Sequence, residues 1–226
     1  MYKGRSISAI LLAAGSSSRM GRNKMLLRFG GLTPIQICTR LFSKLCDEII
    51  IAYSSDTKSA AEDALDGMVL PVKLVSGGES RQESVRNSLQ AATMDIVAIH
   101  DCARCLVTSE IILRSLDSAI CYGNGIASVS VVDTLRNSKS GEIVDRTSLL
   151  AAQTPQSFDR CKLVNAYAHV KGAFTDDAAL YRASGETLHY SEGGRENLKL
   201  TTVDDIALFN AILTMRAETA KCCSES

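Results

Sequence analysis

Residues 7–24 read Ile-Ser-Ala-Ile-Leu-Leu-Ala-Ala-Gly-Ser-Ser-Ser-Arg-Met-Gly-Arg-Asn-Lys. The apolar run Ile7–Leu12 is typical of a strand that is buried on both faces of a parallel sheet. It is followed by Ala13–Ser18, whose side chains are small enough to leave backbone N–H groups open to a ligand. The stretch therefore predicts a buried first strand that ends in a ligand-binding loop.

Three cations follow these small residues at once, namely Arg19, Arg22 and Lys24. Open backbone amides beside fixed cations after a strand are typical of a polyphosphate site. Neither the P-loop pattern G-x-x-x-x-G-K-S/T nor the dinucleotide pattern G-x-G-x-x-G occurs at this turn. The alternative is an ordinary polar loop between a strand and a helix, but the local excess of positive charge favours the polyphosphate site.

The charge of the chain is balanced overall but uneven along its length. Eight Lys or Arg residues precede the first acid, Asp47, whereas the 226 residues together carry 25 basic and 25 acidic side chains. A local positive field suits a small polyanion and not the extended surface of a nucleic acid. No apolar run is long enough to span a membrane and no signal peptide is visible, so we expect a soluble cytoplasmic protein with no membrane partner.

The cysteines predict neither a zinc site nor a disulfide framework. Cys102 and Cys105 form a C-x-x-C pair, but no second cluster of Cys or His completes a tetrahedral site. Four further cysteines lie in apolar contexts and are expected to be buried, reduced thiols: Cys38, Cys46, Cys121 and Cys161.

Apolar segments alternate with helix-like segments as far as Val131. The expected strands are Ile7–Leu12, Ile49–Tyr53, Val72–Val75, Ile96–Ile99 and Ile126–Val131. The helices expected between them are Thr33–Leu45, Lys58–Leu65, Gln82–Ala92 and Ser109–Cys121. This alternation predicts an α/β fold with a doubly wound, mostly parallel, Rossmann-like sheet. Ligands of such sheets bind at the carboxyl ends of the strands.

The pattern changes over residues 133–152, where two short strands flank the turn-forming segment Asn137–Gly141. These features predict a protruding β-hairpin arm. Because the arm has too few apolar residues to bury itself, we expect it to lie against another surface, such as a second subunit.

The rest of the chain continues the same domain. A strand is expected at Thr187–Tyr190, and helices at Arg160–Lys171, Asp176–Ser184 and Val203–Arg216, with fraying from Glu218 onward. No shift in composition marks a domain boundary, so residues 1–226 are predicted to form one domain that includes the arm.

Two polar clusters follow predicted strands. Gly77–Arg86 contains two glycines, Arg81 and Ser84 at a helix start. Glycines allow a planar base to approach the backbone closely, and the Ser84 hydroxyl could read a base edge. The same residues could instead be a capped helix start, with Ser80 and Glu83 as a capping box, and both readings can hold together.

The second cluster is His100-Asp101-Cys102-Ala103-Arg104. A carboxylate such as Asp101 beside bound phosphates coordinates Mg²⁺ or orients a substrate hydroxyl, although a simple turn would also explain it. His100 is expected to be a packed core imidazole. Lys199, in an alternating stretch, either faces solvent or reaches toward an anion from the rim of the sheet.

Seven segments resemble, in the same order, the 2-C-methyl-D-erythritol 4-phosphate cytidylyltransferase family. They are Leu-Ala-Ala-Gly-x-x-x-Arg-Met, Gly-Gly-x-x-Arg-x-x-Ser-Val, His-Asp-x-Ala-Arg, Asp-Thr-Leu, Gln-Thr-Pro-Gln-x-Phe, Thr-Asp-Asp-Ala and Asn-x-Lys-x-Thr, between Ile10 and Leu213. The resemblance implies a homodimeric enzyme that couples CTP to a polyol phosphate, releases pyrophosphate and uses Mg²⁺ held mainly by the CTP phosphates, with Asp101 as a further ligand.

The resemblance also implies roles for individual residues. The CTP-binding residues would be Ala13, Ala14, Gly15, Gly78, Arg81 and Ser84. Arg19 and Lys24 would stabilise the charge that builds up on the α-phosphate. The sugar phosphate would be bound by Asp101, Arg104, Thr134, Arg146, Thr175 and Lys199. Arg146 and Lys199 would position its attacking oxygens, and the arm that carries Thr134 and Arg146 would cross to the partner subunit.

Three other functions fit parts of the sequence. A ribitol 5-phosphate cytidylyltransferase has a similar fold and similar motifs. The short interval between Arg19 and Lys24 also resembles molybdenum-cofactor nucleotidyltransferases. A non-catalytic nucleotide sensor is the alternative from another class. Binding of a nucleotide alone needs no second phosphate site, so Arg146 and Lys199 argue against the sensor.

Overall fold

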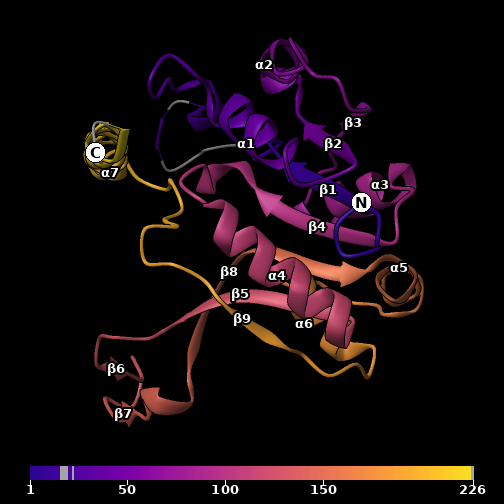
Figure 1. The fold of residues 1–226 in the computed structure, drawn as a ribbon. Helices are drawn as coiled ribbons and strands as arrows, with labels where there is room; N and C mark the ends of the chain where they lie inside the picture. Colours follow the sequence, from indigo (N-terminus) through magenta and orange to yellow (C-terminus); the bar gives the residue numbers. More distant parts are fainter. Residues whose placement is uncertain (16–19, 22, 225–226) are drawn as a thin grey trace.

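The computed structural model describes residues 1–15, 20, 21 and 23–224. Its centre is a seven-stranded sheet with the strand order β3-β2-β1-β4-β8-β5-β9, covered by helices on both faces (Figure 1). The predicted doubly wound α/β fold is therefore confirmed.

Four parallel strands form one half of the sheet: β1 (Ile7–Leu12), β2 (Glu48–Tyr53), β3 (Val72–Ser76) and β4 (Ile96–Asp101). Their starts agree with the sequence prediction to within one residue. Leu12 pairs with Asp101 across β1 and β4, so the two loops that follow these strands leave the sheet at the same edge.

The other half contains a strand that the sequence analysis missed. β8 (Leu150–Asp159) lies between β4 and β5 (Asn124–Ser130) and runs antiparallel to both. β9 (Tyr190–Glu192) pairs in parallel with β5 and begins three residues later than the expected strand at Thr187–Tyr190. The sheet is thus mostly parallel, with one reversed strand near its middle.

Alternate residues of β1 enter two separate cores. Leu11 packs with α1 (Pro34–Phe42), α2 (Lys58–Asp63), α4 (Ser109–Tyr122) and the first turns of α7 (Asp205–Ser224). Ile10 packs with α3 (Arg81–Ala91), α5 (Arg160–His169) and α6 (Asp177–Ala183) on the opposite face. Both residues are fully buried. This period of two is what a strand covered on both sides requires.

The predicted arm is present as β6 (Leu135–Arg136) and β7 (Ile143–Val144), which pair only with each other. Figure 1 shows the arm standing away from the main sheet. The side chain of Ile143 is 65% exposed and that of Val132, at the foot of the arm, is 52% exposed. Within one chain the arm therefore buries little of its own apolar surface.

Two smaller expectations were wrong. α7 continues to Ser224, where fraying from Glu218 was expected. Cys121 and Cys161 are exposed, because each lies on the outer face of its helix, and Cys46 is only half-buried, whereas Cys38 is buried as expected. In the part of the chain that the structure describes, no helix is both long and apolar enough to cross a membrane.

Candidate active site

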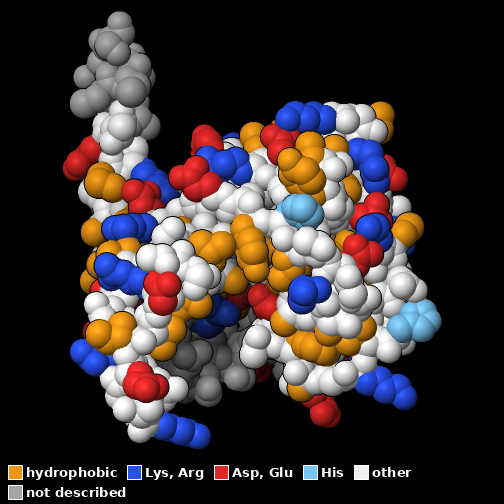
Figure 2. Space-filling model, turned by 90° about the horizontal axis from the view of Figure 1, so that it is seen from below, with side chains coloured by type: hydrophobic (Ala, Val, Ile, Leu, Met, Phe, Trp, Pro, Cys, Tyr) orange, Lys and Arg blue, Asp and Glu red, His pale blue; other side chains and the backbone are white. Residues whose placement is uncertain are grey.

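A cavity of about 340 Å³ lies at the carboxyl edge of β1 and β4, next to the start of α3. Eight of the predicted site residues line it: Ala14, Gly15, Lys24, Gly78, Arg81, Ser84, Asp101 and Lys199. The face seen in Figure 2 is hollowed, and basic and acidic side chains lie together on the wall of the hollow. Residues from four separate segments thus meet where ligands of doubly wound sheets bind.

The glycine pair is required by close packing at one wall of the cavity. A Cβ atom on Gly77 would lie 2.5 Å from the Cβ of Ala14, and one on Gly78 would lie 2.3 Å from the Cγ of Glu83. Both distances are shorter than any van der Waals contact. The loop before α3 can therefore approach Ala14 only because Gly77 has no side chain, while Gly78 leaves room for the side chain of Glu83 on α3.

Ser84 and Glu83 both hold this glycine loop in place. The Gly78 N–H donates to Ser84 Oγ at 3.0 Å, and the Ser84 hydroxyl donates to the Ser80 carbonyl at 3.0 Å. Ser80 is the N-cap, as predicted, since its Oγ accepts from the Glu83 N–H. The carboxylate of Glu83 accepts from the Glu79 N–H at 2.8 Å and not from Ser80, so the predicted capping box is displaced by one residue.

Two carboxylates and two cations form a continuous ionic network at the floor of the cavity. Asp101 Oδ1 lies 3.2 Å from Arg81 Nε, and Asp101 Oδ2 lies 2.7 Å from Lys199 Nζ. Arg81 also pairs with Asp177 at 2.8 Å. The side chain of Asp177 is fully buried and accepts a hydrogen bond from the Tyr167 hydroxyl at 2.6 Å. Neither Asp177 nor Tyr167 was predicted as a site residue. Asp177 stands in the Thr-Asp-Asp-Ala segment, but tertiary packing brings it to Arg81, and Tyr167 lies inside α5 with no distinctive sequence context.

This network fixes the ionisation of Asp101. Burial alone would raise the pKa of its carboxyl, but the nearby charges of Arg81 and Lys199 outweigh burial and hold the pKa well below its usual range. Asp101 is therefore an anion at neutral pH. Its role at the site is that of a fixed acceptor of hydrogen bonds from cations or hydroxyl groups.

The Gln-Thr-Pro-Gln motif in β8 connects three parts of the site. Gln153 Nε2 donates to the Gly194 carbonyl at 2.9 Å. Thr154 Oγ1 accepts from the Asp101 N–H at 3.1 Å. Gln156 Nε2 donates to Asp176 Oδ2 at 2.9 Å. Through these hydrogen bonds, the motif holds together three polar segments that lie far apart in the sequence.

Several predicted residues lie elsewhere. Arg104 does not line the cavity and donates to the Asn197 carbonyl at 2.7 Å. Thr175 is exposed just before α6. Thr134 and Arg146 are exposed on the arm, where Arg146 donates to the Val132 carbonyl. Ala13 is buried and does not line the cavity, while Arg19 and Arg22 lie outside the described residues.

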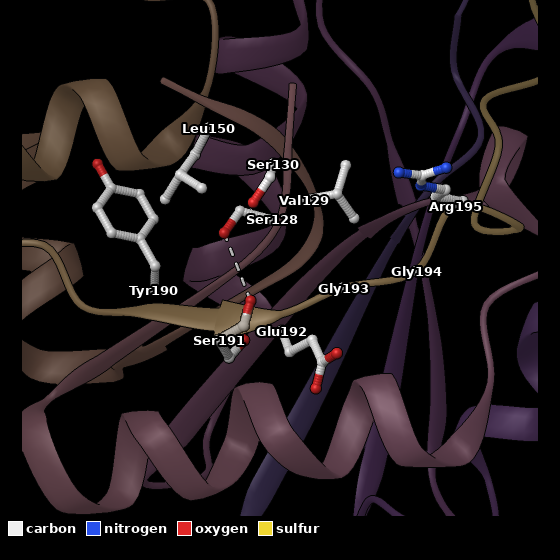
Figure 3. Close-up of a pocket in the computed structure, with 10 residues that line it drawn as sticks. All are labelled: Ser128, Val129, Ser130, Leu150, Tyr190, Ser191, Glu192, Gly193, Gly194 and Arg195. Carbon is white, nitrogen blue, oxygen red and sulfur yellow. Dashed lines mark hydrogen bonds between the residues drawn. The ribbon is translucent and has the colours of Figure 1, made fainter. Parts of the chain in front are cut away.

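A second cavity, of about 490 Å³, contains none of the predicted residues. It lies at the foot of the arm, where Ser130 ends β5 and Leu150 begins β8 (Figure 3). Tyr190 and Arg195 border it from the next segment of the chain. Its larger volume does not make it the active site, since Lys24, Gly78 and Asp101 all line the smaller cavity.

The site offers no ligand set of its own for Mg²⁺. Both carboxylate oxygens of Asp101 already contact cations, a surrounding that does not fit a direct metal ligand. Among residues 1–15, 20, 21 and 23–224 there is no group of three or more His, Cys, Asp or Glu side chains that could hold a metal ion.

Comparisons with known proteins identify the family. The family model for IspD, 2-C-methyl-D-erythritol 4-phosphate cytidylyltransferase, matches residues 7–215. The enzyme of that name from Geobacillus kaustophilus is 37% identical over 92% of this chain and 97% of its own length. The bifunctional enzyme IspD/IspF from Anaeromyxobacter dehalogenans is 32% identical over 94% of this chain, and the match spans 58% of that relative.

Solved structures agree with this result. A 4-diphosphocytidyl-2C-methyl-D-erythritol synthase from Anaerococcus prevotii matches with a TM-score of 0.83 and 27% identity, over 93% of this chain and 97% of that one. The 2-C-methyl-D-erythritol 4-phosphate cytidylyltransferase from Thermus thermophilus matches with a TM-score of 0.79 and 28% identity, over 92% of this chain and 98% of that one. The chain therefore belongs to the 2-C-methyl-D-erythritol 4-phosphate cytidylyltransferase family.

Proposed function

We propose that this protein transfers the cytidylyl group of CTP to 2-C-methyl-D-erythritol 4-phosphate and releases pyrophosphate, a step in the synthesis of isoprenoid precursors. The observation that carries the proposal is the meeting of eight predicted residues around one cavity in a chain of this family. The small-residue loop and the glycine pair fit a nucleotide, and the pair of Asp101 and Lys199 fits a second, phosphorylated substrate.

The reaction needs no nucleophile from the protein. A phosphate oxygen of the polyol phosphate attacks the α-phosphorus of CTP, a new P–O bond forms, and the bond to the β-phosphate oxygen breaks. The bonding electrons leave with pyrophosphate. Catalysis is then positioning of the two substrates and stabilisation of the charge on the α-phosphate. We assign that stabilisation to Lys24, which lines the cavity, together with Arg19.

The acceptor is held on the Asp101 side of the cavity in this proposal. Lys199 binds an anionic oxygen of the acceptor, while the Asp101 carboxylate accepts a hydrogen bond from one of its hydroxyl groups. Arg104 and Thr175 complete the acceptor site near the rim. On the nucleotide side, Ser84 and the Gly78 backbone read the cytosine edge, beside Ala13, Ala14, Gly15 and Arg81.

Mg²⁺ enters with the triphosphate of CTP in this scheme. When bound, the ion neutralises part of the phosphate charge and favours departure of pyrophosphate. The described part of the chain supplies no cluster of metal ligands, and this fits an ion held by the nucleotide.

We further propose a cytoplasmic homodimer in which each site is completed by the partner's arm. Thr134 and Arg146 lie on an arm that stands away from its own cavity. The arm and its foot also leave Ile143 and Val132 more than half exposed. A twofold interface would bury these apolar side chains and bring the two polar residues to the other subunit's site.

Pyrophosphate release tests the function. The protein is incubated with CTP, Mg²⁺ and either 2-C-methyl-D-erythritol 4-phosphate, ribitol 5-phosphate or no acceptor. We expect rapid release with the first acceptor alone and much slower release with UTP, whose exchanged donor and acceptor leave buried polar groups unpaired. Faster pyrophosphate release with ribitol 5-phosphate would instead indicate a ribitol 5-phosphate cytidylyltransferase. Binding of CTP without release of pyrophosphate would indicate a nucleotide sensor.

A further inference from the structure

The turn between Asp101 and Arg104 is held from beneath by a buried histidine. Residues Cys102–Arg104 form a short 3-10 turn directly after β4. His100, the residue before Asp101, is fully buried, and its ring packs against Phe42 at a centroid distance of 5.1 Å. The histidine cannot contact a ligand in the cavity, yet both of its ring nitrogens have polar partners near the turn.

One nitrogen contacts the far end of the turn. His100 Nε2 lies 3.3 Å from the carbonyl oxygen of Arg104. A carbonyl oxygen can only accept a hydrogen bond, so Nε2 carries the proton and donates. The Arg104 carbonyl also accepts from the Val107 N–H at 3.0 Å. The His100 bond therefore ties the residue that carries a proposed acceptor-binding guanidinium to the end of β4.

The other nitrogen contacts the near end of the turn through one hydroxyl group. His100 Nδ1 lies 3.1 Å from Thr154 Oγ1, which also accepts from the Asp101 N–H at 3.1 Å. Burial lowers the pKa of His100 to about 4, so the ring is neutral and Nδ1 accepts the Thr154 proton. The hydrogen bonds among His100, Thr154 and the backbone of the turn therefore fit one arrangement of protons: Nε2 is protonated and Nδ1 is not.

The geometry points to His100 as a positioning residue for the acceptor substrate: through Nε2 it holds the backbone of Arg104, and through Thr154 the backbone of Asp101. These contacts fix the positions of Asp101 and Arg104, the two proposed acceptor-binding residues, relative to each other. This inference rests on the proposed function for its kinetic consequence, whereas the hydrogen bonds themselves do not depend on it. The contrasting interpretation is that the imidazole only fills space beside Phe42.

Two substitutions separate these interpretations. The amide nitrogen of glutamine falls close to the place of Nε2, so His100→Gln keeps a donor for the Arg104 carbonyl but has no acceptor for the Thr154 hydroxyl. The side chain of asparagine ends near Nδ1, so His100→Asn can accept from Thr154 but leaves the Arg104 bond unmade. Both variants remove the ring from Phe42, and both should therefore lose thermal stability to a similar degree.

We expect His100→Asn to raise the KM for the polyol phosphate about tenfold, equivalent to ~1.4 kcal/mol. His100→Gln should raise it less than about threefold, and the KM for CTP should stay within about twofold of wild type in both. Normal acceptor KM values in both variants would overturn the proposal, because each variant lacks one of the two contacts through which His100 holds the turn.

A crystallographic readout keeps the inference separable from the proposed function. If wild-type protein releases no pyrophosphate with any polyol phosphate, the proposed function fails on that result alone. The crystal structures of both variants would then decide the positioning role. A displaced 101–104 turn in His100→Asn, with an undisplaced turn in His100→Gln, supports it. A turn that is unchanged in both variants overturns it.

Discussion

The Nζ atom of Lys199 lies 2.7 Å from Oδ2 of Asp101, although 98 residues separate them in the chain. The side chain of Lys199 is 40% exposed and that of Asp101 is 11% exposed. Lys199 is therefore the partner that an incoming phosphate can reach, while Asp101 keeps its bond to Arg81 at 3.2 Å. In the proposed function, the pair binds the acceptor, and its two charges already balance each other before the acceptor arrives.

Lys199→Ala should lower kcat/KM for the polyol phosphate by about 10²-fold, because a charge-assisted contact to phosphate is lost. The KM for CTP should change less than about threefold. Lys162→Ala is the matched control, since Lys162 also forms an ion pair, with Glu186 at 3.0 Å, but on the exposed surface. Steady-state kinetics with each substrate varied in turn provide the measurement, and a parallel rise in both KM values would contradict the assignment.

Lys24→Ala should lower kcat by about 10²–10³-fold. CTP binding should fall much less, since the contact strengthens as charge builds on the α-phosphate in the transition state. The measurements are kcat from pyrophosphate release and the CTP dissociation constant from calorimetry. Lys44→Ala, an exposed lysine just after α1, serves as the control. A near-normal kcat would remove Lys24 from the mechanism and favour Arg22.

Mixing two inactive variants tests whether the arm acts in the partner's site. Lys24→Ala damages the body of one subunit, and Arg146→Ala damages the arm. After random exchange of subunits half of the dimers are mixed, and each holds one intact site, so roughly a quarter of all sites should work. Activity after mixing is compared with that of each variant alone. If exchange is verified by mass spectrometry and no activity returns, Arg146 acts within its own subunit or not at all.

The buried Glu48 should contribute stability that depends on pH. Its carboxylate accepts from Ser8 Oγ at 2.5 Å, from the Thr93 N–H at 2.6 Å and from Lys73 Nζ at 2.8 Å. Burial would raise the pKa of Glu48, but the hydrogen bonds from Lys73, Ser8 and Thr93 outweigh it and lower the pKa below its ordinary value of 4.5. The charged form is therefore favoured in the folded state.

Glu48→Gln should lower the free energy of unfolding at pH 7 by about 2 kcal/mol. Because the folded pKa is lower than the unfolded one, this contribution is complete above the unfolded value and is lost as the pH falls below 4.5. Urea unfolding at pH 7 and at pH 4 measures the difference, which should shrink at the lower pH. Glu62→Gln, from an exposed pair with Lys58, should have little effect at either pH.

The parallel half of the fold could be predicted because its strands are apolar on both faces. Ile7–Leu12 has no polar residue except Ser8 and is bounded by a turn, so its ends are visible in the sequence. β8 has the opposite character. Its buried stretch contains Gln153, Thr154 and Gln156, which are satisfied by hydrogen bonds to other segments and not by apolar packing. Hydrophobic patterning cannot detect a strand of that kind.

The candidate site likewise contains residues that the sequence predicts and residues that it does not. Ala14, Gly78 and Lys24 could be predicted because their residue types are unusual in their places, and they meet at one cavity. Asp177 and Tyr167 could not, since their role depends on contacts to Arg81 and to each other across α5 and α6. These contacts are made by tertiary packing: the Thr-Asp-Asp-Ala segment contains Asp177 but does not reveal its pairing with Arg81.

The reversed direction of β8 gives the arm a thermodynamic link to the site. Because this strand opposes β4, it begins at the carboxyl edge of the sheet, so the chain passes from the arm through Leu150 to Thr154 within four residues. Thr154 accepts from the backbone of Asp101. If the arm's partner and the acceptor each bind one arrangement of this strand more tightly than another, binding of the partner changes acceptor affinity by a coupling free energy. By reciprocity, a bound acceptor then changes the affinity of the arm for its partner by the same amount.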